Sequence, residues 1–148
     1  MATTGLDVFD KTLQTTHIWL DEIMEELGPD RQIAYRALRA VLHALRDRLS
    51  VDETAHLGAQ LPLVIRGVFF DSWHPAGKPL KIRSREEFCE HVAQELSDTR
   101  PIDPEDACRA VFGCIDRHVS AGEVQDVISS LPEDIRRLWP RNENTQPR

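Results

Sequence analysis

Apolar residues recur every three or four positions along most of the chain, which is the spacing of helices that bury one face. The first stripe consists of Phe9, Leu13, Leu20, Ile23 and Leu27, and the second of Ile33, Ala37, Val41, Leu45 and Leu49. Gly28-Pro29 separates them, because glycine accepts the left-handed C-terminal position and proline cannot continue the hydrogen-bond ladder. No segment alternates with period two, so the pattern predicts an all-α protein.

The sequence repeats itself after a shift of 70 residues. Recurring pairs include Ala37/Ala107, Arg39/Arg109, Ser50/Ser120, Glu53/Glu123, Leu61/Leu131, Pro62/Pro132 and Arg66/Arg136. We expect two imperfect helical repeats of about four helices each, related by a pseudo-twofold axis and packed as one compact domain. The predicted boundaries are a first repeat at 1–70, a connector at 71–83, a second repeat at 84–139 and a flexible tail at 140–148.

Several polar residues stand where helices are expected to begin. Asp30 and Asp103 are predicted N-caps, and Pro104 suits the first helical position. The segments Ser50–Glu53, Ser84–Glu87 and Ser120–Glu123 have capping-box form, in which both side chains bond to backbone amides. Leu61-Pro62 and Leu131-Pro132 are expected to end one helix and start a short final one in each repeat.

The repeated arginines admit two interpretations. Arg66 and Arg136 are expected to cap the end of the preceding helix or to pair with a carboxylate. The alternative is a symmetric pair of surface sites for one partner, which predicts exposed arginines that lack intramolecular partners. We favour the structural interpretation.

Four motifs carry a resemblance to a known family. They are, in order, Gln60-Leu61-Pro62, Ile65-Arg66-Gly67, Trp73-His74-Pro75-Ala76-Gly77-Lys78-Pro79 and Ser120-Ala121-Gly122-Glu123. Together they resemble a bacterial family known as domain of unknown function 2267, and the resemblance covers most of the chain. It implies a small all-α bacterial protein and supplies no activity, cofactor or catalytic residue.

Composition narrows the class of protein. The 148 residues carry 18 basic and 25 acidic side chains, for a net charge of −7. No apolar run approaches the ~20 residues of a membrane helix, and the first ten residues lack the features of a signal peptide. Three cysteines without repeated spacing suit reduced thiols. We therefore expect a cytoplasmic protein without membrane contact.

Charge is unevenly distributed, with a balance of −6 in residues 1–30, +6 in residues 31–85 and −7 in residues 86–148. The basic middle of the chain suggests a site for an anion, such as a phosphate, or for an acidic protein face. The candidate residues of this site are Arg66, Trp73, His74, Lys78, Lys81, Arg83 and Arg85. The competing interpretation is solvation, or pairing with acidic segments of this chain or of a second copy, with Trp73 anchoring the connector in the core. Duplex DNA is disfavoured by the net charge.

Two residue pairs have the spacing of metal ligands on one helix face, namely Cys114 with His118 and Glu53 with His56. Neither pair recurs in the other repeat, where Glu123 is followed by Asp126 instead of a histidine. We therefore predict no metal and no cofactor, with the cysteines as core residues and His118 on the surface. No nucleophile elbow or phosphate loop is present, which argues against an enzyme.

The sequence favours a non-enzymatic protein-interaction module whose partner is an unknown protein or a second copy. The first alternative is a protein that binds an anion or phosphate ligand through the basic 66–85 region. The second alternative is a small-molecule or metal site between the repeats.

Overall fold

The structure is a computed structural model that describes residues 4–98 and 100–140, and within these ranges every regular element is an α-helix. The eight helices of the described chain are α1 (Asp7–Leu27), α2 (Arg31–Arg48), α3 (Val51–Gln60), α4 (Leu63–Phe70), α5 (Arg85–Glu95), α6 (Pro104–His118), α7 (Ala121–Ser130) and α8 (Glu133–Arg136). The all-α prediction is confirmed. Apart from Pro140, the predicted tail at 140–148 lies outside the described residues.

The helix starts follow the local sequence. The Asp30 carboxylate accepts a bond from the Gln32 amide at 2.9 Å, and the Asp103 carboxylate accepts one from Glu105 at 2.9 Å. The hydroxyls of Ser50, Ser84 and Ser120 cap α3, α5 and α7. Among the described helices, only α5 has a complete capping box, with Glu87 bonding back to Ser84. The prediction that Glu53 and Glu123 bond back to the amides of Ser50 and Ser120 is wrong, because the two carboxylates lie beside each other instead.

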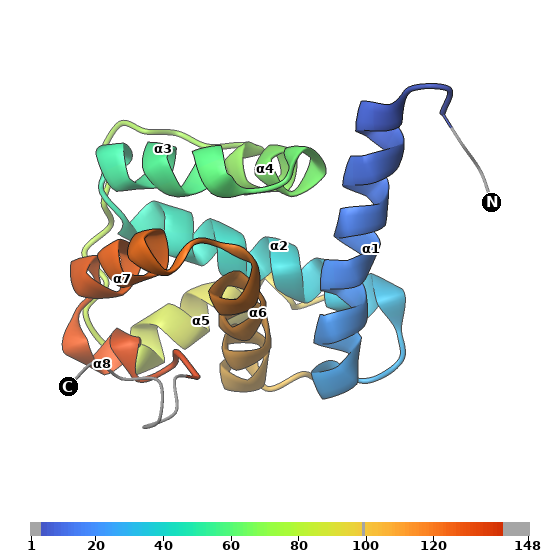
Figure 1. Cartoon of the computed structure of the whole chain (residues 1–148). Helices are drawn as coiled ribbons and strands as arrows, with labels where there is room; N and C mark the ends of the chain where they lie inside the picture. The colour runs from blue at the N-terminus through green and yellow to red at the C-terminus, as the bar shows by residue number, and fades with distance from the viewer. Residues whose placement is uncertain (1–3, 99, 141–148) are drawn as a thin grey trace.

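One hydrophobic core joins both halves of the chain. Helices α2 and α6 lie at its centre, where α1 and α5 each pack against both of them (Figure 1). Trp19, Phe88 and Phe112 are fully buried in this core, and the indole of Trp139 stacks on Phe112 at 4.2 Å. Cys108 and Cys114 are also fully buried, as predicted. Because α2 and α6 come from opposite halves, the core belongs to the whole molecule.

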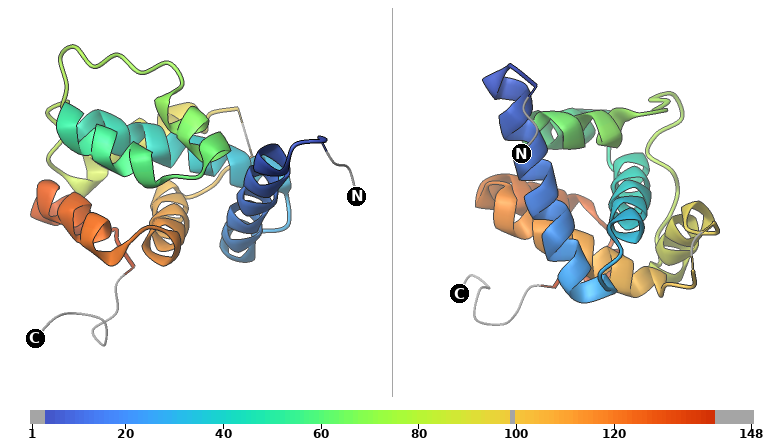
Figure 2. Two further views of the ribbon diagram at one scale, coloured as in Figure 1. Left: turned by 45° about the horizontal axis from the view of Figure 1, so that its top comes forward. Right: turned by 90° about the vertical axis from the view of Figure 1, so that its right-hand side faces the viewer.

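Helix α3 packs against α7, so the two halves also meet away from the central helices (Figures 1 and 2). The Ser120 amide at the start of α7 donates to the Gln60 side-chain oxygen at the end of α3, at 3.2 Å. This contact brings residues that are far apart in the sequence to a single junction.

The segment between α4 and α5 is held on the C-terminal end of α2. The Leu80 amide donates to the Asp47 carbonyl at 2.8 Å, and the Arg48 Nε donates to the Ile82 carbonyl at 2.6 Å. Trp73 does not enter the core as predicted. Its ring is half-buried and lies 5.3 Å from Phe70, because the backbone is fixed by α2 rather than by the indole.

Only part of the first apolar stripe, which lies on α1, is buried. Leu20 and Ile23 are buried, whereas Phe9 and Leu13 are 45% and 43% exposed. The reason is orientation, since α4 packs on the side of α1 that carries Val8, Thr12 and Thr15, and Phe9 and Leu13 lie on another side of the helix. No helix in the described ranges combines the length and apolar character that crossing a membrane requires.

Candidate functional site

The repeated arginines cap helices, as the favoured interpretation predicted. Arg66 donates to the carbonyls of Ala59 at 3.2 Å and Leu61 at 3.0 Å, which closes the end of α3. Arg136 makes the equivalent bonds to Ser129 at 3.2 Å and Leu131 at 2.7 Å.

The other repeated arginine pair is also engaged. The guanidinium of Arg39 bonds the Asp71 carboxylate at 2.6 Å, and that of Arg109 bonds Glu105 at 2.8 Å. The alternative of symmetric arginines without intramolecular partners is therefore wrong.

The predicted anion-binding residues have separate tasks in the structure. The Arg66 Nε donates to the Gly58 carbonyl of α3, and the Lys78 Nζ donates to the His74 carbonyl at 2.8 Å. The Arg85 amide donates to the Asp134 carboxylate at 2.7 Å, which ties the start of α5 to α8. The remaining members are half-buried Trp73 and exposed His74, Lys81 and Arg83. The anion hypothesis stays a prediction, and Lys81 and Arg83 are its accessible cations.

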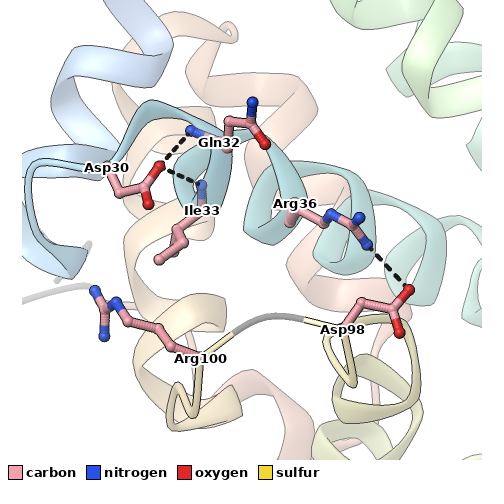
Figure 3. A pocket seen from close by; sticks show the side chains of 6 residues that line it. All are labelled: Asp30, Gln32, Ile33, Arg36, Asp98 and Arg100. Atoms are coloured by element: carbon pink, nitrogen blue, oxygen red, sulfur yellow. Dashed lines mark hydrogen bonds and ion pairs between the residues drawn. The ribbon is translucent and has the colours of Figure 1, made fainter.

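A surface feature that the sequence did not reveal lies along α2 (Figure 3). A hollow of about 230 Å³ is lined by Asp30, Gln32, Ile33, Arg36, Asp98 and Arg100. Beside it, a second hollow of about 310 Å³ includes Tyr35, Arg39 and Glu95. Cations and carboxylates face one another here, as in the 3.6 Å pair of Arg36 and Asp98, so neither hollow offers an unopposed charge. Only the fold brings the turn after α5 to this face.

Apolar side chains are concentrated at the N-terminal end of α1. Leu6, Val8, Phe9 and Leu13 are 43–58% exposed, and Leu63 at the start of α4 is 47% exposed. We call these five residues the apolar end of the molecule. A hollow of about 300 Å³ between the two helices is lined by Val8, Lys11, Thr12, Thr15, Pro62 and Leu63. The buried Thr12 hydroxyl accepts a bond from the Val64 amide at 3.1 Å, which fixes α4 beside α1.

The pair Cys114 and His118 meets Glu22 of α1. One oxygen of Glu22 accepts bonds from Arg117 Nε at 2.8 Å and from the Cys114 thiol at 3.3 Å, and the other lies 2.9 Å from His118 Nε2. Burial raises the pKa of Cys114, and Glu22 raises it further, so the thiol stays protonated. The side chains of Glu22, Cys114, Arg117 and His118 thus satisfy one another's polar groups. The Arg117 guanidinium already neutralises the Glu22 carboxylate.

The pair Glu53 and His56 meets Glu123 where α3 packs on α7. One potential ligand atom from each of these three residues lies within 4.8 Å of the other two. Glu123 is 7% exposed, and its Oε2 is buried without a hydrogen-bond partner, as is the Oε2 of Glu53. The charges acting on Glu123 are those of the Glu53 and Asp126 carboxylates. The sequence indicated one helix of this cluster but gave no sign that Glu123 would face it.

The comparison with protein families gives one match. The model described as "Uncharacterized conserved protein (DUF2267)" matches residues 16–138. No curated protein sequence matches the chain.

Proposed function

Because the chain belongs to the DUF2267 family, whose description assigns no activity, we propose its function from the molecular surface. We propose a non-enzymatic protein-interaction module that docks an amphipathic helix of a partner protein at the apolar end of α1. The two helical repeats, related by a pseudo-twofold axis, form the scaffold beneath it. The equivalent bonds of Arg66 and Arg136 support this relation between the repeats.

The concentration of exposed apolar side chains carries the proposal. Five of the eight large hydrophobic residues that are exposed in the described ranges belong to the apolar end. Apolar residues scattered singly over a surface need no explanation, but a cluster beside a hollow is typical of an interaction site. A groove between two helices suits a third helix that inserts side chains from successive turns.

Charge favours a basic partner over a second copy. Asp7 and Asp10 lie in the first turn of α1 and outnumber Lys11, the one basic residue among positions 4–15. Two copies that met through this end would bring the same acidic residues together at the rim. A helix with lysines flanking its apolar stripe would instead gain complementary contacts.

A designed peptide tests this interface on the full chain. The probe is a helical peptide with leucines at positions i, i+3, i+4 and i+7 and lysines flanking this stripe, and its comparison peptide replaces the lysines with glutamates. We expect the lysine peptide to bind and Val8→Ser or Leu63→Ser, at the two residues of the apolar end that line the hollow, to weaken its binding by about tenfold or more. Fluorescence anisotropy measures the affinity, and circular dichroism checks the fold of each variant.

Ile18→Ser is the matched control, because Ile18 is 45% exposed on the same helix but does not line the hollow. Its substitution should leave the affinity unchanged. Equal binding of the glutamate peptide, or equal loss in the Ile18 variant, would contradict the proposed chemistry. A wild-type dimer that Val8→Ser converts into a monomer would assign the surface to a second copy instead.

A further inference from the structure

We propose that Glu53, His56 and Glu123 bind a divalent transition-metal ion, represented by Zn²⁺, at the junction of α3 and α7. This site is separate from the apolar end and does not depend on the function proposed above. It would link the two halves of the chain, since two ligands come from α3 and one comes from α7.

The geometry supplies three ligands without rearrangement of the backbone. Glu53 and His56 are three residues apart on α3, so their side chains lie on one face. Glu123 faces them from α7, and the three ligand atoms lie within 4.8 Å of one another. Ligands around one Zn²⁺ ion stand about 3–3.5 Å apart, given bonds of about 2.0–2.2 Å. Small rotations of the side chains would therefore complete the site.

The carboxylates of Glu53 and Glu123 lie beside each other, and their own contacts are incomplete. The Oε2 atoms of Glu53 and Glu123 are both buried without a hydrogen-bond partner. Unpaired carboxylates in such a position are costly, whereas metal coordination or protonation satisfies them. Burial, and then the adjacent Glu53, raises the pKa of Glu123 to about 8, which is the response of a buried carboxyl beside another carboxylate.

The donor set favours zinc and similar ions over magnesium and calcium. An imidazole nitrogen with two carboxylate oxygens suits borderline transition metals, whereas Mg²⁺ and Ca²⁺ prefer oxygen ligands alone. Because His56 is exposed, the ion could enter from solvent and keep water in its remaining positions.

The cluster at Glu22 provides an internal contrast. It also holds a carboxylate and an imidazole, but Arg117 and His118 both contact the Glu22 carboxylate. A metal ion there would have to displace a guanidinium, so His118 is the matched control for His56.

The experiment measures Zn²⁺ binding to the full chain after treatment with a chelator and removal of that chelator. Competition with a chromophoric indicator gives the affinity and stoichiometry, and thermal melting with and without Zn²⁺ gives an independent readout. We expect one equivalent to bind and to raise the melting temperature of the wild-type protein. Glu123→Gln and His56→Ala should each weaken binding by at least about tenfold and remove the thermal shift, while His118→Ala should change neither.

Glu123→Gln also separates loss of the site from loss of the fold, because an amide of the same shape relieves the repulsion between the carboxylates. This variant should fold, with a melting temperature without metal no lower than that of the wild type. Absence of wild-type binding, or binding unaffected by Glu123→Gln and His56→Ala, would overturn the proposal. Loss of binding in His118→Ala alone would place the ion at Glu22, and displacement of Zn²⁺ by equimolar Mg²⁺ would contradict the role of the imidazole.

Discussion

Polar groups at the C-terminal end of α2 hold the segment between α4 and α5 in place, and half-buried Asp47 shows how. Its carbonyl accepts the Leu80 amide, and its carboxylate, 14% exposed, bonds Arg46 at 2.8 Å and lies 3.9 Å from His91. Burial by itself would raise the pKa of Asp47, but the contacts with His91 and Arg46 outweigh it and lower the pKa to about 2. The ionised form therefore stabilises the folded state.

This shift predicts a loss of stability in acid. Because the folded-state pKa of Asp47 lies below its ordinary value of 3.8, the contribution is complete above that pH and is lost as the pH falls toward 2. We expect Asp47→Asn to cost about 2 kcal/mol at pH 6 and almost nothing at pH 2. Urea unfolding of both proteins across this range measures the difference, and a difference independent of pH would contradict the assignment.

Local polar contacts are also what the sequence predicts best at the residue scale. The Asp30 and Asp103 caps join residues only two or three positions apart, so the local sequence nearly determines them. Glu53 and Glu123 fit the same local rule but lie beside one another instead. Their contact depends on the packing of α3 on α7, which no local pattern contains.

At the scale of elements, α3 and α4 pack so closely at Gly58 that there is no space for a side chain at this position. A Cβ atom at this position would lie 2.5 Å from the Phe70 ring of α4, so the two helices meet through the missing side chain. Gly67 on α4 has open space around its would-be Cβ. Two glycines in neighbouring helices therefore have opposite tolerances for alanine.

We expect Gly58→Ala to destabilise the protein by about 1–3 kcal/mol, because the ring of Phe70 must move. Gly67→Ala is the matched control and should stabilise it by up to about 1 kcal/mol, since alanine favours a helix interior. Chemical denaturation measures both changes. A stabilising Gly58→Ala would show that the ring moves freely and that α3 and α4 are not closely packed.

The positions of the helices were predictable, but the side of α1 against which α4 packs was not. Gly28-Pro29, Leu61-Pro62 and Leu131-Pro132 mark real boundaries, because these residues act on their own backbone. The stripe of Phe9 and Leu13 indicated burial, yet α4 packs on another side of α1, beside Thr12, and leaves these two residues exposed. Periodicity reports which face of a helix is apolar and says nothing about what lies opposite.

At the scale of the whole molecule, the two halves of the chain do not form separate cores. Helix α2 packs against α5 and α6 of the second half, and α1 packs against α6. The internal repeat predicted related helices in each half, but it could not show that these contacts cross between halves. The same crossing produces both ligand clusters, since Glu22 meets His118 and Glu53 meets Glu123.

A shared core implies that the two halves unfold together. Ile115 is fully buried in α6, and Ile115→Val should lower the free energy of unfolding by about 0.5–1.5 kcal/mol. The slowest amide hydrogens of α2 and α6 should then exchange faster by the same factor, about fivefold for 1 kcal/mol, although the substitution lies in one half. Gln125→Ala, at an exposed position of α7, is the control and should leave both helices unchanged. Faster exchange in α6 with α2 unaffected would mean that the halves open independently, and the core would then be two units in contact rather than one.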